Sequence, residues 1–429
     1  MSTMRHALVV GGGIGGLTAA LMLQRAGMAV DVFESARQIR ELGVGINLLP
    51  HCVRVLDGLG LLERLEQVSI ATSDFSYYTR RGQLIWQEPR GRRAGYQWPQ
   101  LSIHRGRLQG VLLEAALRSP DLRIHTGHHF QRFEQAGQRV RAVFLDRAGG
   151  TERSYEGDLL LGADGIHSAV RASLYPTDDP LRWRGTLLWR GLAEAPPFLS
   201  GTSMIIAGSS KQRFVAYPIS PQTQPDRALI NWAVELPAEG PLMIPNDWGR
   251  EGRHEDFAPA FAEWRFPWLD IPALMWQTPV VYQFPMVDKD PLPRWSFENV
   301  TLLGDAAHPM YPVGSNGASQ AILDAEALAG ALAEEGQIAA ALERYEQQRR
   351  PATAAIVQSN RQMGPDVVMD IVEERAPDGF TDLEAVIPRH EREEIAQRYM
   401  RTAGFDRDTV NRASQPPGAT APAPPPKPE

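Results

Sequence analysis

Three glycines and one acidic residue near the start of the chain have the types and spacing that suit a bound dinucleotide. Gly11, Gly13 and Gly16 form the pattern GxGxxG. Between a strand and a helix, the first glycine permits the tight turn, the second lets the backbone approach a pyrophosphate, and the third lets the helix pack on the strand. Unpaired N–H groups at the start of that helix attract phosphate. Glu34 stands where an acid binds the adenosine ribose, and the pattern fits NAD and FAD equally.

The elements that must position these groups are a strand over residues 7–10, a helix over 14–26 and a strand over 29–33. The first strand is continuously apolar, as a strand buried on both faces must be. Apolar periodicity predicts further elements: a helix over residues 108–117, strands over 122–125, 139–145, 158–161 and 300–303, and long helices over 317–360.

The middle of the chain has a different pattern. Residues 181–295 are rich in tryptophan and proline, and residues 213–219 and 228–234 alternate between apolar and polar, which predicts a largely antiparallel sheet. The last residues, 414–429, are rich in proline and have no apolar periodicity, so we expect a disordered tail.

Two further motifs carry chemistry. Asp164 and Gly165 follow the strand predicted over 158–161, and Asp305 follows the strand over 300–303, where a loop leads through Pro312 to a helix beginning at Gly317. Ligands of open α/β sheets bind at the carboxyl ends of the strands. With the glycine pattern, these motifs resemble the three signatures of the single-component (group A) FAD-dependent aromatic hydroxylases, the group of hydroxybenzoate and salicylate hydroxylases. Longer stretches, residues 41–47, 99–106, 215–219, 284–293 and 314–324, resemble the phenazine hydroxylases of that group.

The resemblance implies an α/β fold with a Rossmann-like (GR2-type) FAD-binding domain, a discontinuous β-sheet substrate domain and C-terminal helices. The expected divisions are residues 1–180 and 296–360 for FAD binding, 181–295 for the substrate domain, 361–413 for the helical region and 414–429 for the tail. The implied FAD contacts lie in or beside the three motifs: Gly11, Gly13, Ile14, Gly15, Gly16, Glu34, Ser35, Gly45, Arg105, Phe130, Asp164, Gly165, Asp305, Gly317, Ala318 and Ser319.

The resemblance also implies a reaction. NAD(P)H, as NADH or NADPH, binds transiently and reduces FAD, and the reduced flavin reacts with O2 to a C4a-hydroperoxyflavin that hydroxylates a planar aromatic or N-heteroaromatic small molecule. No second GxGxxG between a strand and a helix exists in the chain, which argues against a two-nucleotide reductase. The oligomeric state, monomer or homodimer, stays open.

Aromatic residues offer a pocket for such a substrate. The candidate contacts are Trp189, Tyr217, Trp232, Phe284 and Met310, although each can equally belong to the core of the sheet.

Three residues are the catalytic candidates: Asn47, Tyr217 and Pro312. Asn47 can donate or accept a hydrogen bond but cannot act as a base. Tyr217 can anchor a substrate hydroxyl or be a buried tyrosine, and Arg190 can bind a carboxylate or join two domains. No general base stands at the matched positions, so either the substrate is already activated or the base lies elsewhere.

Composition narrows the class of protein. The 429 residues are 43% hydrophobic and 22% charged, with a net charge of −7, which suits a globular enzyme and argues against nucleic-acid binding. A single cysteine, Cys52, excludes an internal disulfide and a Cys-rich metal site, and we expect it to be buried rather than catalytic. The uncharged residues 7–23 resemble a short membrane span, but their glycines would make a poor apolar helix, so we expect a cytoplasmic protein.

Other functions on the same scaffold are a flavin reductase, a halogenase and a non-catalytic FAD-binding sensor. The WxWxIP stretch of related halogenases has no match here; residues 264–268 read WRFPW. Product formation that depends on O2 would separate a hydroxylase from a reductase and a sensor.

Overall fold

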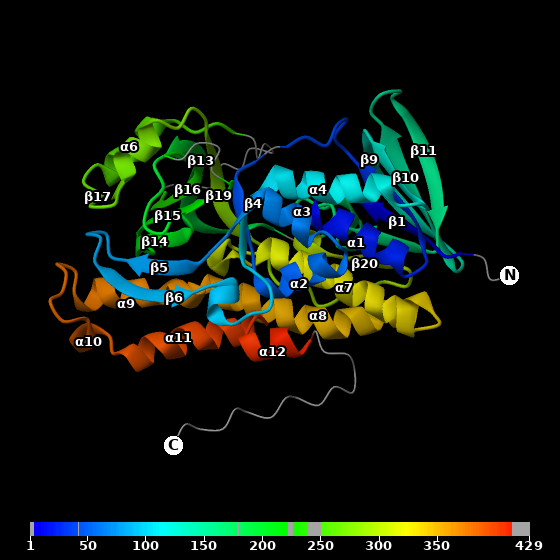
Figure 1. Ribbon diagram of the computed structural model, residues 1–429. Helices are drawn as coiled ribbons and strands as arrows, with labels where there is room; N and C mark the ends of the chain where they lie inside the picture. The colour runs from blue at the N-terminus through cyan, green and yellow to red at the C-terminus, as the bar shows by residue number, and fades with distance from the viewer. Residues whose placement is uncertain (1–3, 42, 178–179, 222–225, 239–249, 414–429) are drawn as a thin grey trace, which may run out of the picture.

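The computed structural model describes residues 4–41, 43–177, 180–221, 226–238 and 250–413, so the predicted tail over 414–429 lies outside the described residues. Two sheets lie side by side with helices beneath them (Figure 1). A parallel sheet lies at the end of the molecule that holds the N-terminus, and a larger sheet lies at the opposite end.

The first sheet is fully parallel, and its strands are largely buried except for β8 at one edge, where only Leu122 is buried. In order across the sheet they are β20 (Val300–Leu302), β12 (Leu159–Gly162), β1 (His6–Val10), β2 (Ala29–Glu34) and β8 (Leu122–Thr126). Helices α1 (Ile14–Arg25), α4 (Arg105–Arg118) and α7 (Gly317–Glu334) pack beside it, with α1 in contact with both others. The elements predicted around the three motifs are confirmed. Because all five strands run the same way, the segments that follow β1, β2, β12 and β20 meet at one edge.

The second sheet has seven strands. Its order is β19 (Val281–Asp288), β13 (Arg182–Ala195), β16 (Ala228–Pro237), β15 (Gln212–Pro218), β14 (Ser203–Ser209), β5 (Asp74–Tyr78) and β6 (Leu84–Pro89). All neighbours are antiparallel except β14 and β5. The predicted antiparallel sheet is confirmed, and it extends beyond residues 181–295, because β5 and β6 from the N-terminal part form its edge.

The two faces of this sheet have different neighbours. One face, with Trp232 and Phe214, packs in an apolar cluster with α6 (Ile271–Trp276) and η3 (Ala258–Phe261). The other face is covered at its β14–β6 end by α9 (Val367–Arg375) and α11 (Arg389–Thr402), and elsewhere borders a cavity.

Smaller elements connect these parts. The small sheets comprise β9 (His128–Ala136), β10 (Arg139–Asp146) and β11 (Thr151–Gly157); β3 (Gly45–Leu48), β7 (Leu101–His104) and β4 (Ser69–Ala71); and β17 (Arg265–Phe266) with β18 (Leu269–Asp270). The remaining helices are α2 (Pro50–Gly58), α3 (Leu62–Gln67), α5 (Ala169–Leu174), α8 (Ile338–Arg361), α10 (Leu383–Val386) and α12 (Arg407–Arg412). Short 3-10 turns are η1 (Gly91–Ala94), η2 (His254–Asp256), η4 (Gly304–Ala306), η5 (Val313–Ser315) and η6 (Gly364–Asp366).

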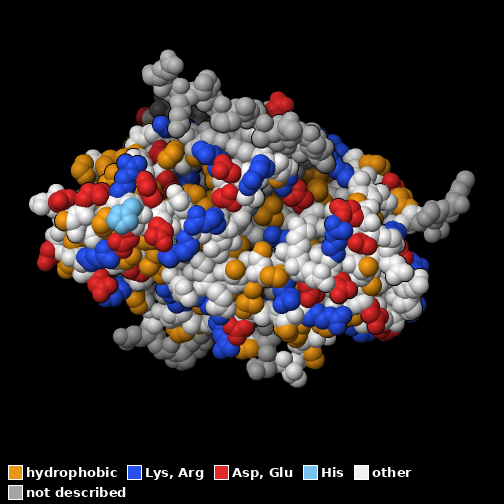
Figure 2. All heavy atoms as spheres, turned by 90° about the horizontal axis from the view of Figure 1, so that it is seen from below, with side chains coloured by type: hydrophobic (Ala, Val, Ile, Leu, Met, Phe, Trp, Pro, Cys, Tyr) orange, Lys and Arg blue, Asp and Glu red, His pale blue; other side chains and the backbone are white. Residues whose placement is uncertain are grey.

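The surface seen from below carries acidic and basic side chains of both signs, interspersed with scattered apolar ones (Figure 2). Among the described residues, no helix combines the length and the apolar character needed to cross a bilayer. Cys52 is fully buried in α2, as expected, and burial raises the pKa of its thiol to about 12, which leaves it unreactive.

Candidate active site

A cavity of about 410 Å³ lies between the carboxyl edge of the parallel sheet and the inner face of the seven-stranded sheet. Its wall includes the starts of two helices, α1 and α7, and side chains from β13, β14, β15 and β16. The three motifs and the middle sheet, far apart in the sequence, therefore border one space.

The glycine turn after β1 is built for close approach. Gly11 has a φ of +105°, and a Cβ there would lie 2.4 Å from the carbonyl oxygen of Ala163. A Cβ on Gly16 would lie 2.0 Å from the oxygen of Gly11. Gly13 is the N-cap of α1, has no side-chain cap and has open space where a Cβ would be. Gly13 and the two residues after it line the cavity, so the uncapped N–H groups of α1 are available to a phosphate.

Glu34 ends β2 beside this turn. Its Oε2 accepts a hydrogen bond of 2.9 Å from the backbone N of Gly12, and its Oε1 accepts one of 2.8 Å from the N of Ala36. Ser35 donates to the same carboxylate at 3.2 Å. These contacts hold the acid next to the glycine turn, which is the position that a ribose-binding acid requires.

The second helix start faces the same cavity. Gly317 and Ala318 line it at the beginning of α7, where Asn316 gives no side-chain cap. Asp305 is surrounded by protein, but its side chain is accessible to solvent because it faces this cavity. Burial raises the pKa of Asp305. Arg105, the first residue of α4, also lines the cavity.

Other predicted FAD contacts lie in the surrounding shell. The Asp164 carboxylate accepts from Ala169 N at 2.7 Å and so caps α5, while Gly165 lines the cavity. Phe130 is buried in β9 against Phe144. The hydroxyl of Ser319 faces α2, where Cys52 Sγ lies 3.2 Å away.

The loop before α7 is held by a residue from the C-terminal region. Gly314 has a φ of +67° and Ser315 a φ of +57°. The Tyr399 hydroxyl in α11 lies 2.9 Å from both Asn316 Nδ2 and Asn360 Oδ1. A Cβ on Gly314 would lie 2.0 Å from this hydroxyl oxygen, so the glycine is required for the contact.

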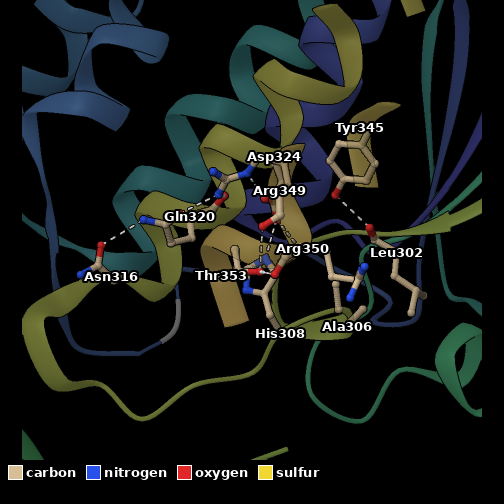
Figure 3. A network of polar contacts seen from close by, with 12 residues as sticks. Leu302, Ala306, His308, Asn316, Gln320, Asp324, Tyr345, Arg349, Arg350 and Thr353 are labelled. Carbon is tan, nitrogen blue, oxygen red and sulfur yellow. Dashed lines mark hydrogen bonds and ion pairs between the residues drawn. The ribbon is translucent and has the colours of Figure 1, made fainter. Parts of the chain in front are cut away.

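A second network fixes the other side of this loop (Figure 3). Asp324 of α7 lies between His308 and Arg349, with 2.6 Å to His308 Nε2 and 2.7 Å to Arg349 Nε. It also accepts from the backbone N of Gly304 at 3.1 Å. Gln320 continues the network to Arg349 at 2.6 Å. Together these bonds join η4, α7 and α8 directly behind the wall formed by Asp305.

The sheet side of the cavity has a polar cluster at the start of β3. Tyr217 donates to the carbonyl oxygen of Gly45 at 2.9 Å, and Arg190 donates to the same oxygen. Gly45 N donates to Asn231 Oδ1 at 2.7 Å. Burial raises the pKa of Tyr217, which keeps its proton. Asn47 accepts a hydrogen bond from Ser102 at 2.6 Å, and its NH2 group has no hydrogen-bond partner among the described residues. Asn47 also lines the cavity.

The predicted aromatic contacts divide between the two faces of the sheet. Met310 and Pro312 line the cavity, as Tyr217 does. Trp189 and Trp232 do not, because successive side chains of a strand point to opposite faces and these two point into the apolar cluster with Phe257. Phe284 is half-buried on β19 and is not part of the cavity wall.

Sequence reasoning missed the apolar residues of the sheet that do line the cavity; two of them, Leu188 and Ala233, stand next to those tryptophans in the sequence. Leu188, Ala233, Val215, Met204 and Ile206 line the cavity with apolar side chains. Three charged residues of the wall were also not among the predicted contacts: Arg213, Glu235 and Asp366. The alternating pattern of β15 and β16 could have indicated Arg213 and Glu235. Arg213 lies on the same face of β15 as Tyr217, and Glu235 lies on the same face of β16 as Asn231.

The site therefore fits a dinucleotide with a flat ring. Two uncapped helix starts suit a pyrophosphate and an anionic ring edge, and the acids Glu34 and Asp305 suit hydroxyl groups. The remaining wall is a mixed apolar and polar sheet face, which is typical of a pocket for a small organic molecule.

Comparisons with known proteins agree with this geometry. The family described as "FAD binding domain" matches residues 4–360. Phenazine 1,6-dicarboxylic acid hydroxylase PhzS of Lysobacter antibioticus is 46% identical over 366 residues, covering 84% of this chain and 90% of that protein. 3-Hydroxybenzoate 6-hydroxylase of Klebsiella oxytoca is 31% identical over 373 residues, 85% of this chain and 89% of that protein. Klebsiella pneumoniae HpxO, solved with FAD and uric acid, has a TM-score of 0.73 at 25% identity, covering 96% of this chain and 97% of that one.

Proposed function

Because the chain belongs to the FAD binding domain family and is an FAD-dependent aromatic monooxygenase, we propose that it hydroxylates a planar, fused-ring N-heteroaromatic compound bound on the sheet face of the cavity. Bound FAD would accept the electrons of NAD(P)H and activate O2. The residues of this chain bind and orient both molecules and exclude water.

One observation carries the choice of a fused-ring substrate. Three cross-strand pairs of β15 and β16 lie in succession on the cavity face: Tyr217 with Asn231, Val215 with Ala233, and Arg213 with Glu235. The outer pairs are four residues apart along each strand, or about 13 Å at 3.3 Å per residue. An apolar floor between two polar pairs at this distance suits a fused ring system with a polar group at each end better than a single ring.

The proposed FAD contacts run along the cavity wall and continue past it to Glu34, which lies beside the glycine turn and outside that wall. The start of α1, at Gly13 and Ile14, takes the pyrophosphate, and Glu34 takes the adenosine ribose. Asp305 and Arg105 take the ribityl chain and neighbouring polar groups. The start of α7, at Gly317 and Ala318, takes the polar edge of the ring. The other contacts proposed here shape or support this path: Gly11, Gly15, Gly16, Ser35, Gly45, Phe130, Asp164, Gly165 and Ser319.

The proposed substrate contacts lie at the Gly45 cluster. Asn47 donates a hydrogen bond from its NH2 group, and Tyr217 holds the strand start against which the ring lies. Arg190 recognises a carboxylate: it is half-buried, lines the cavity, and its Nε has no partner among the described residues. The relative with 46% identity acts, by its name, on a phenazine dicarboxylic acid, which agrees with such a contact. Met310 and Pro312 complete the apolar wall.

The function is tested by NADH and NADPH oxidation with the FAD-loaded protein. The panel contains phenazine carboxylates and other fused N-heteroaromatics, with hydroxybenzoates as single-ring controls. We expect strong stimulation by a fused-ring acid, with one atom from labelled O2 in the product and little hydrogen peroxide. Stimulation by single-ring acids alone would contradict the fused-ring proposal. Oxidation of the donor with hydrogen peroxide as the only product, for every compound, would contradict a hydroxylated substrate of this panel.

Replacing Tyr399 by phenylalanine tests how the flavin loop is held. The variant leaves Asn316 and Asn360 without their shared hydroxyl partner in a buried site. We expect the free energy of unfolding to fall by about 1–3 kcal/mol and FAD to bind more weakly, measured by denaturant unfolding and FAD titration. Tyr96→Phe is the control, because its hydroxyl donates to Phe405 O outside the cavity wall. The control should lose stability and keep its FAD affinity; equal FAD affinity in both variants would contradict the role of Tyr399.

A further inference from the structure

Three charged side chains meet at the end of the sheet face that lies away from the Gly45 cluster. Arg213 of β15 has its Nη1 3.3 Å from Glu235 Oε2 of β16 and 3.3 Å from Asp366 Oδ2 of η6. Arg213 is 2% exposed, Asp366 4% and Glu235 9%, and all three line the cavity. The triad thus belongs to the wall of the proposed substrate site.

Packing alone does not explain these charges. Buried ion pairs recover little of the free energy that their desolvation costs, and apolar residues of similar size are often as stable. The triad is also incompletely paired: Arg213 Nε has no hydrogen-bond partner among the described residues, and Asp366 Oδ1 receives no hydrogen bond from them. A buried polar group with unused bonding capacity on a cavity wall indicates a place for a ligand group.

The charge balance decides the kind of group. Two carboxylates face one guanidinium, so the triad is negative overall when both acids are ionised. Asp370 of α9 stands behind it with its carboxylate already bonded to Ser210 N at 2.6 Å. A negative, hydrogen-bond-accepting site favours a donor and disfavours a second carboxylate.

We propose that Arg213, Glu235 and Asp366 form a donor subsite, in which the free oxygen of Asp366 accepts a hydrogen bond from a hydroxyl or amino group on the far edge of the aromatic substrate. This inference rests on the proposed function, because it takes the same ring to lie on Val215 and Ala233. The two ends of the cavity then carry opposite charge, with the positive Arg190 at one end and the negative triad at the other. A substrate with a carboxylate at one edge and a donor at the other binds in a single orientation.

The binding test uses a matched pair of probes, 2-hydroxyphenazine and its 2-methoxy ether, titrated into the FAD-loaded protein and followed by the flavin absorbance. We expect the natural protein to prefer the hydroxyl compound by about tenfold, as for a charge-assisted hydrogen bond. Asp366→Asn should reduce this preference to about twofold and leave the affinity for the ether unchanged. Asp370→Asn, which removes a nearby carboxylate outside the cavity wall, should keep the natural preference.

Other results of this titration would contradict either the donor subsite alone or the fused-ring proposal as well. An unchanged preference in Asp366→Asn, or no preference in the natural protein, overturns the donor subsite while leaving the proposed fused-ring site intact. Failure of the natural protein to bind either probe overturns the fused-ring proposal and the subsite with it.

A second measurement needs no variant. Burial raises the pKa of Asp366 to about 6, against the opposing effect of Arg213. The carboxylate that accepts the donor is therefore present above this pH, and the preference for the hydroxyl probe should fall as the pH is lowered from 7 to 5. The other charged or ionisable groups that act on Asp366 are Glu235, Asp370, Arg90, Tyr77 and Tyr399, and burial raises the pKa of both tyrosines far above that range. A preference that is constant from pH 7 to 5 overturns the role of Asp366.

Discussion

Replacing Gly13 by alanine is expected to weaken FAD binding by about 10–100-fold while leaving the folded apoprotein intact. Gly13 has a φ of −77° and a ψ of −175°, which alanine adopts freely. Its Cβ would meet no atom of the described residues within 4 Å, since it would stand in the open space at the start of α1. With the pyrophosphate at its proposed position by this helix start, the added methyl group would collide with the cofactor rather than with the protein. An overpacked contact costs about 1–3 kcal/mol, and a 10–100-fold loss of affinity, about 1.4–2.8 kcal/mol, lies within that range.

The measurement compares FAD titration with thermal unfolding of the apoprotein. Gly330→Ala is the matched control, because Gly330 also has no atom within 4 Å of its Cβ but lies inside α7, away from the cavity wall. It should bind FAD as the natural protein does and be slightly more stable, since alanine is the better helix former. Natural FAD affinity in Gly13→Ala would show that the cofactor phosphates do not lie at this helix start.

The cofactor side of the site could be predicted from the sequence because its determinants are local. Gly11, Gly13 and Gly16 act within one strand–turn–helix unit, and Asp305 follows its strand directly. Parallel strands then bring the segments after β1 and β20 to the same edge without any further information. The strand and helix assignments around these residues are confirmed for the same reason.

The substrate side could not be predicted to the same extent, because it depends on which face of each strand is turned to the cavity. Alternation indicates that Leu188 and Trp189 point in opposite directions, but not which of them points inward. The aromatic residues were the natural candidates, yet Trp189 and Trp232 form the core on the far face. That choice is set by α6 and η3, which pack on the far face and come from a later part of the chain.

The sequence showed no general acid or base at the positions that match the hydroxylase motifs, because charged residues of the cavity come together only in the tertiary fold. Asp366 lies about 150 residues after Arg213 in the sequence, in a short turn without a motif, and meets it only through the tertiary fold. Asp324 was part of a recognised stretch, but its partners His308 and Arg349 come from two other elements. Contacts of this kind have no periodicity from which a single sequence can indicate them.

Replacing Asp324 by asparagine is expected to lower the free energy of unfolding by about 3–5 kcal/mol, the cost of leaving a buried charge without its partner. Asp324 is fully buried and accepts from His308 and Arg349 (Figure 3). It accepts from the backbone N of Gly304 at the same time. An asparagine NH2 group would face one of these donors, and Arg349 would lose its counter-charge. Because the network supports η4 and the start of α7, the variant should also retain less FAD. Glu326→Gln is the control on the same helix, because its partly exposed ion pair with Arg54 is worth at most about 1 kcal/mol.

The pH dependence of stability follows from the same residue. Burial alone would raise the pKa of Asp324, but His308 and Arg349 outweigh it and hold the pKa at about 2, compared with 3.8 for an unperturbed aspartate. A carboxyl group with a lowered pKa in the folded state stabilises the fold above its unfolded pKa, and this contribution is lost as the pH falls through the folded value. Between pH 4 and 2 the natural protein should therefore lose stability faster than Asp324→Asn, which has no such group to protonate. Denaturant unfolding at pH 7, 4 and 3 measures the difference between the two proteins, and a gap that stays constant over this range would mean that the Asp324 charge does not stabilise the fold.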